Sequence, residues 1–134
     1  MAIYAFSMPI LPGKTEDLKR YLNEMTGPRM RDYDRSCQKQ GLRSEHMFIQ
    51  HIPQGNSPDM LLIVWDVDDP MRMFQQGLDP NDSFENWFMD KVMVGCLGVK
   101  ADQMKPDQMP PLNQHIVNYT MGAGEKERVQ TGKR

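Results

Sequence analysis

A chain of 134 residues is long enough to form one domain with its own core, without a metal or a disulfide to hold it together. Its formal net charge of −2 lacks the basic excess of a general nucleic-acid binder, so we expect no nucleic-acid partner. The longest strongly apolar run, residues 60–65, is too short to span a bilayer, and the N-terminus lacks the charged start of a signal peptide, so we expect a cytoplasmic protein with no membrane partner.

The first third of the chain predicts a strand followed by a broken helix. Residues 2–8 are rich in aromatic and β-branched types, which favours a strand. Apolar residues at helical spacing over 18–25 predict a helix, which Gly27-Pro28 should break. The helical pattern then resumes and should end at Gly41.

The polar side of the resumed helix carries four basic residues. An anion site is one interpretation of them, but two acidic residues lie among them, and we favour a solvated helix face. The basic residues are Arg29, Arg31, Arg35 and Lys39, and the acidic ones are Asp32 and Asp34.

Two extended runs, residues 43–52 and 60–67, flank a loop with two prolines and a glycine, which predicts a β-hairpin. The second run is apolar on both of its faces. Strands of this kind are usually covered on both sides. A chain this short has helices for one face of a sheet, so we expect something else to cover the other.

The second half predicts two more helices. Asp69-Pro70 should begin a short one that runs through Gln76, since aspartate caps helices and proline suits the first helical position. Asp82 with Glu85 resembles a capping box. It precedes an apolar stripe, Phe84, Phe88 and Val92, which we expect to pack on the sheet.

The remaining residues predict a last strand and a tail. A polar, proline-containing connection covers residues 99–113, and a strand is expected over 114–121. The chain is therefore divided into one domain, residues 1–121, and a flexible charged C-terminal tail, residues 122–134.

The order strand, helix, strand, strand, helix, strand predicts an α+β fold of the ferredoxin-like β-α-β-β-α-β type. Its four-stranded antiparallel sheet would carry both helices on one face. Because the other face would be bare and apolar, we predict a homodimer in which two sheets face each other.

At this point the chain resembles the dimeric α+β barrel superfamily, which includes the antibiotic-biosynthesis monooxygenase-like domains. The resemblance covers residues 2–121. It implies either a cofactor-independent, monooxygenase-like enzyme on a small organic substrate or a small isomerase, since members have diverse activities and some have none known. The resemblance depends on Pro12-Gly13-Lys14, on the strand 41–48, and on Phe84 with Trp87-Phe88.

The three histidines, His46, His51 and His115, lack metal-ligand spacing, so no metal site and no cofactor are expected. A haem held by one histidine stays an alternative. The best constellation joins His46, as the catalytic residue in proton transfer, with aromatic residues on other strands. If they share the inner sheet face, they would line a cavity for a small aromatic or hydrophobic ligand. The ligand-binding residues would be Tyr4, Trp65, Tyr119, Phe48 and Gln50.

Two classes of function stay open. The first is a metal-free enzyme acting on a small organic substrate with the help of His46. The second is a non-catalytic dimer that binds a small ligand or is purely structural. In the second case His46 is an ordinary edge histidine, and the aromatic residues are the core of the dimer.

Overall fold

The computed structural model of the protein describes residues 2–76, 79–100 and 114–122. The strands are β1 (Ala2–Pro9), β2 (Leu42–Gln50) and β3 (Met60–Val67). The helices are α1 (Thr15–Thr26), α2 (Met30–Lys39), α3 (Pro70–Gln76) and α4 (Ser83–Phe88), and α4 continues into a π-helix, η1 (Met89–Val94). No helix in these ranges is both long and apolar enough to cross a membrane.

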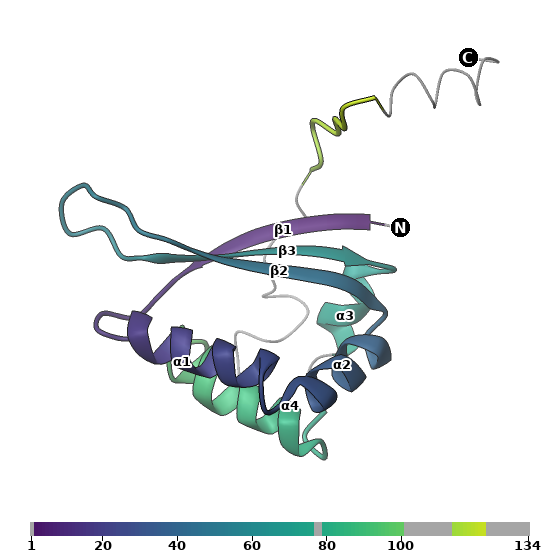
Figure 1. Cartoon of the computed structure of the whole chain (residues 1–134), viewed down its shortest axis with the longest axis horizontal. Helices are drawn as coiled ribbons and strands as arrows, with labels where there is room; N and C mark the ends of the chain where they lie inside the picture. Colours follow the sequence, from purple (N-terminus) through teal and green to yellow (C-terminus); the bar gives the residue numbers. More distant parts are fainter. Residues whose placement is uncertain (1, 77–78, 101–113, 123–134) are drawn as a thin grey trace.

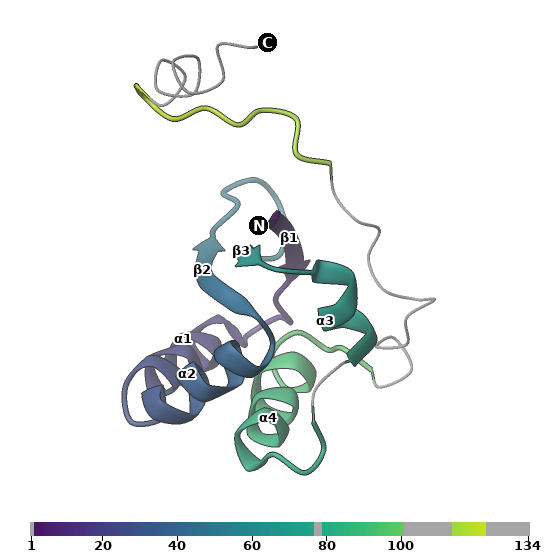
Figure 2. The same cartoon turned by 90° about the vertical axis from the view of Figure 1, so that its right-hand side faces the viewer.

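The strands form an antiparallel sheet in the order β1-β3-β2, which confirms the α+β class and the β2–β3 hairpin. A bulge interrupts β2 between Leu42 and Ser44. Figure 1 shows the helices on one side of the sheet, and Figure 2, turned by 90°, shows α1, α2 and α4 on that same side. The sheet therefore has one face packed on helices and one face without them.

The break in the first helical region lies where the sequence predicts it. α1 ends just before Gly27, and α2 begins at Met30. At the end of α2, Gly41 has a φ of +71°, a left-handed conformation that residues with a side chain rarely adopt. This glycine turns the chain directly into β2, which places α2 beneath the edge of the sheet.

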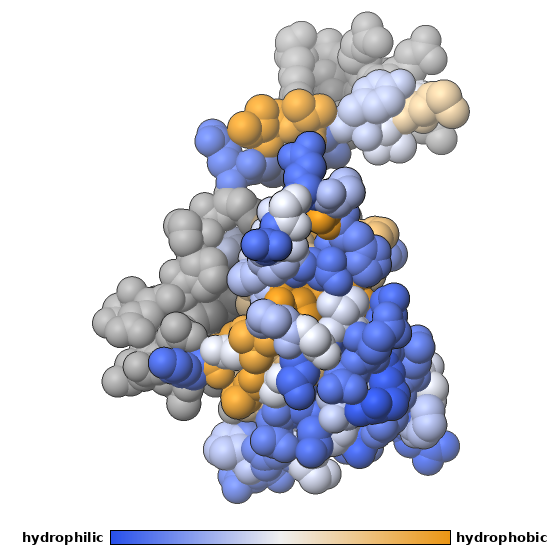
Figure 3. All heavy atoms as spheres, turned by 90° about the vertical axis from the view of Figure 1, so that its left-hand side faces the viewer, coloured by the Kyte–Doolittle hydropathy of each residue, from blue (hydrophilic) through white to orange (hydrophobic). Residues whose placement is uncertain are grey.

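The expected fourth strand was wrong. Residues 114–120 have no regular secondary structure, and the apolar side chains of the segment are exposed, among them Ile116 at 83%, Val117 at 74% and Met121 at 87%. Figure 1 shows this segment beyond the sheet, and Figure 3 shows hydrophobic side chains on it. Alternation indicates which face of a strand would be buried, but a strand also needs an edge to pair with. In the described part of the chain the sheet therefore has three strands, and the ferredoxin-like arrangement is incomplete.

The core lies between the sheet and the helices. On β3 the buried side chains alternate with half-buried ones, and Val67 and Leu61 are almost inaccessible. Leu18 of α1 is fully buried in this core, and so is Val92 of the predicted stripe, while Phe88 packs partly buried against it. Phe84 is buried as well, but its ring lies beside those of Tyr33 on α2 and Trp87 rather than in the core cluster against the sheet. Each such side chain stabilises the fold by roughly 1.5–3 kcal/mol.

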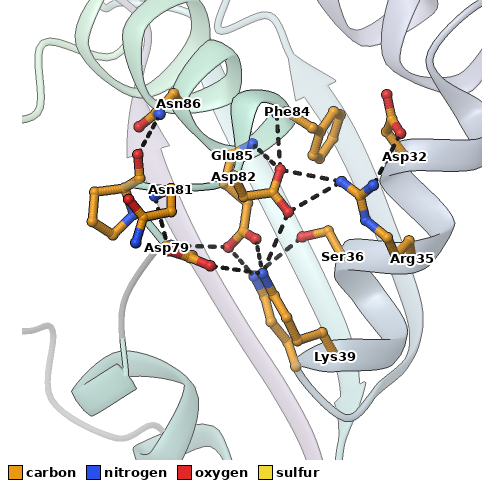
Figure 4. Close-up of polar contacts among 12 residues, drawn as sticks. Asp32, Arg35, Ser36, Lys39, Asp79, Asn81, Asp82, Phe84, Glu85 and Asn86 are labelled. Carbon is orange, nitrogen blue, oxygen red and sulfur yellow. Dashed lines mark hydrogen bonds and ion pairs between the residues drawn. The ribbon is translucent and has the colours of Figure 1, made fainter.

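A network of ion pairs joins α2 to the start of α4 (Figure 4). The Lys39 ammonium contacts Glu85, whose side chain is almost fully buried, and lies 3.4 Å from Asp82. Arg35 lies 3.1 Å from Asp82 and 3.3 Å from Asp32. The predicted pairing of Asp32 with Arg35 on the surface of α2 is thus confirmed. Arg35 and Lys39 also form ion pairs with residues at the start of α4.

The predicted capping box is half present. Asp82 caps α4, because its Oδ1 accepts hydrogen bonds from the backbone N–H groups of Phe84 and Glu85 at 2.9 and 3.2 Å. The Glu85 carboxylate accepts from the backbone N–H of Asp79 and from the Gln40 amide instead. The charge of Lys39 draws Glu85 inward, so it serves the contact between helices rather than the cap.

Candidate functional site

The predicted aromatic cluster is divided between the two faces of the sheet. Trp65 faces the helices and is 8% exposed, and Tyr4 beside it on β1 is 3% exposed. Their ring centroids lie 5.9 Å apart in a stacked arrangement. His46 is exposed and opposes Val64 on β3, so it points to the helix-free face. The expectation that His46 shares a face with Tyr4 and Trp65 was therefore wrong.

The other predicted ligand-binding residues are divided as well. Phe48, 56% exposed, and Gln50 lie on the same face as His46, as their spacing on β2 predicts. Tyr119 lies in the segment beyond the sheet and is 79% exposed. The structure therefore joins His46 with Phe48 and Gln50, joins Tyr4 with Trp65, and places Tyr119 with neither group.

The helix-free face has an apolar centre. Phe48 opposes Leu62, which in turn opposes Ser7 of β1, and His46 opposes Val64 in the next row. At one end the face becomes polar. There Arg43 Nη2 lies 2.7 Å from Asp66 Oδ1, and Arg43 Nη1 contacts Asp68.

A second cluster lies on the helix side, around Glu45 of β2. The Tyr33 hydroxyl, from α2, donates a hydrogen bond to Glu45 Oε1 at 2.5 Å. The Trp65 indole N–H, from β3, donates to Glu45 Oε2 at 2.6 Å. Trp65 is also flanked by Phe6, whose ring centroid is 4.9 Å away. A half-buried carboxylate is thus held by two neutral donors beside a group of aromatic rings.

Burial sets the electrostatics of this cluster. It raises the pKa of Glu45, while the hydrogen bonds from Tyr33 and Trp65 act in the opposite direction. Burial and the nearby Glu45 charge raise the pKa of Tyr33. The same two causes raise the pKa of the Cys37 thiol to about 12, so this cysteine stays protonated and is a poor nucleophile.

The sequence analysis did not select Glu45, although a signal for it was present. Alternation along the strand places Glu45 on one face with Met47 and Ile49, which are apolar. An acidic residue on an otherwise apolar strand face requires a partner, because burying a charge alone is unfavourable. Tyr33 could not be assigned as that partner from sequence alone, since it lies on a different element.

A third group of polar residues, at the far end of the hairpin, does not form a catalytic arrangement. Thr15 donates a hydrogen bond to Asp59 Oδ2 at 2.7 Å, and His51 Nδ1 lies 3.0 Å from Asp59 Oδ1. Hydroxyl and imidazole both bind the carboxylate rather than each other, so no base activates the hydroxyl. In the described part of the chain, no three side chains of histidine, cysteine, aspartate or glutamate are grouped to hold a metal.

In the part of the chain that the structure describes, these features define a small α+β protein with a three-stranded antiparallel sheet, one face of which carries no helix. No family model, curated protein or solved structure matches the chain. The likeness to the dimeric α+β barrels therefore stays a prediction from the sequence. The side chains on the two faces of the sheet are the features that bear on function.

Proposed function

We propose that the protein acts as a homodimer in which two copies pack their helix-free sheet faces against each other. The observation that carries this proposal is the position of Phe48 on β2, a large aromatic side chain that is 56% exposed on that face, beside Leu62 of the central strand β3. Ile3, on β1, is 44% exposed on the same side. Exposed apolar side chains that gather on one surface typify interaction sites.

The alternation on β3 supports the same proposal. Its outward side chains Leu62 and Val64 are apolar and half-buried, although no helix in the described ranges lies over them. Strands that are apolar on both sides are usually covered on both. An identical copy is the simplest cover, because a two-fold axis places the same patch on both partners. Arg43 with Asp66 then belongs to a polar rim.

This assembly is the predicted dimeric α+β barrel, here built from two three-stranded sheets. A non-catalytic role, binding or structural, fits the proposed interface better than a monooxygenase-like enzyme. His46 would lie at the interface, but Asp66, the ionisable acid on that face, is held by Arg43. Tyr4 and Trp65, the aromatic residues that the enzyme would need, lie on the other side of the sheet.

The test replaces one exposed apolar residue on the helix-free sheet face and one on the helices. Phe48→Lys places a charge on the proposed interface beside Leu62 and should weaken association by more than about tenfold, since an unpaired charge resists burial. Met30→Lys is the matched control, because Met30 is 46% exposed but lies on α2. Light scattering coupled to chromatography should give a dimer for the unmodified chain and for Met30→Lys, and a monomer for Phe48→Lys.

Circular dichroism on all three proteins separates dissociation from unfolding. The far-ultraviolet spectrum of Phe48→Lys should match that of the unmodified chain, because Phe48 lies outside the core. If the two lysine variants keep the same mass as the unmodified chain, the sheet face is not the interface and the proposal is wrong.

A further inference from the structure

Among the described residues, Glu45 has no cationic partner, which distinguishes it from Glu85 and Asp82. Glu85 contacts Lys39, and Asp82 contacts both Lys39 and Arg35. None of the ion pairs among the described residues includes Glu45. Its hydrogen-bond partners, Tyr33 and Trp65, are both neutral.

This arrangement leaves capacity for one more partner. Each carboxylate oxygen can accept two hydrogen bonds, and each oxygen of Glu45 accepts one from the described residues. Carboxylates that are withdrawn from water are normally balanced by a positive group. A cationic ligand would supply both the missing charge and the missing donors.

The surroundings suit an ammonium group attached to an apolar body. Trp65 lies in contact with Tyr4 and Phe6, and aromatic rings attract cations as well as apolar groups. Met47 and Cys37 add apolar surface near the carboxylate, and both are half-buried. The cluster lies where β2, the outer strand of the described sheet, passes over α2, and there the side chains of Glu45 and Tyr33 are both only half-buried.

From this geometry we propose that Glu45, with Tyr33 and Trp65, forms a binding site for a small organic cation. Glu45 would bind the ammonium group, Tyr33 and Trp65 would hold the carboxylate in place, and the apolar part of the ligand would contact the half-buried side chains of Tyr33, Met47 and Cys37. The site lies on the opposite side of the sheet from the proposed dimer interface, so it does not depend on the oligomeric state.

Isothermal titration calorimetry on the full chain tests this site with two probes of similar shape, benzylamine and benzyl alcohol. Benzylammonium should bind saturably and at least about tenfold more tightly than the alcohol, because only the cation satisfies Glu45. Glu45→Gln keeps the size of the side chain but removes the charge, and it should abolish this preference. Glu16→Gln, which alters a carboxylate on the exposed surface of α1, should leave it unchanged.

The same titration at several pH values provides a readout that a purely structural role for Glu45 would not change. Since the cation binds the ionised carboxylate, the preference should weaken as the pH falls and Glu45 takes up a proton. Tyr33→Phe removes one donor and keeps the charge, so it should retain the preference and serves if Glu45→Gln does not fold. Equal binding of the two probes, no saturable heat with benzylamine, or an unchanged preference in folded Glu45→Gln would each overturn the proposal.

Discussion

Among single residues, Glu45 should have the clearest effect on the pH dependence of stability. Burial raises its pKa in the folded protein above that of an ordinary glutamate, and the donors Tyr33 and Trp65 offset this only in part. The folded state therefore holds its proton to higher pH than the unfolded state does. Stability from this group is fully present below the ordinary glutamate pKa and is lost as the pH rises through the raised pKa of the folded state.

We therefore predict that Glu45→Gln gains stability relative to the unmodified chain as the pH rises. Each unit by which folding raises the pKa corresponds to about 1.4 kcal/mol. Thermal unfolding of the two proteins over a pH series measures the difference. It should grow above the ordinary glutamate pKa and level off above the pKa of folded Glu45. A difference that is independent of pH would show that Glu45 ionises equally easily in both states.

Between elements, the contact of α2 with α4 depends on one buried carboxylate. Glu85 is 1% exposed, and Lys39 is the cation that contacts it. Asp82 joins the same network while it caps α4. Because Asp82 is the N-cap of α4 and Glu85 lies in its first turn, this network fixes where the helix begins and how it lies against α2 (Figure 4).

Removing the cation should destabilise the protein noticeably. Lys39→Met keeps the apolar stem and leaves Glu85 with neutral donors, which should cost about 1–3 kcal/mol of unfolding free energy. Arg20→Met is the control, since Arg20 forms a solvent-exposed pair with Asp17 and its loss should destabilise the protein much less. Urea unfolding measures both changes. Equal losses in the two variants would mean that Glu85 does not need its cation.

Comparison of the predicted with the observed elements shows which features of the fold can be predicted from the sequence. Local signals sufficed for the hairpin and for the break at Gly27, because proline, glycine and alternation act on neighbouring residues. They also sorted the residues of each strand into two sets. Alternation does not say which of the two sets on one strand shares a sheet face with a given set on the neighbouring strand, because that depends on the register between the strands. For this reason His46 was wrongly grouped with Trp65. The helix-facing Glu45 site was missed for another reason, because its partner Tyr33 lies on α2 and the pattern of the strand gives no information about contacts with a helix.

For the whole molecule, the fold leaves one broad question, namely what covers the second face of the sheet. All the described helices lie on the other side, and Phe48 and Ile3 remain exposed. The segment 114–122 adds further exposed apolar side chains beyond the sheet. We therefore expect the chain to gain stability by associating with a copy of itself, as proposed above.

The most direct test of this account is the mass of the full chain in solution. Sedimentation equilibrium over a wide concentration series should give twice the chain mass of 15.6 kDa, because two sheet faces are expected to pack together. The same experiment at high salt should give the same mass, since the proposed contact is mainly apolar. A single species of 15.6 kDa at every concentration would contradict the account.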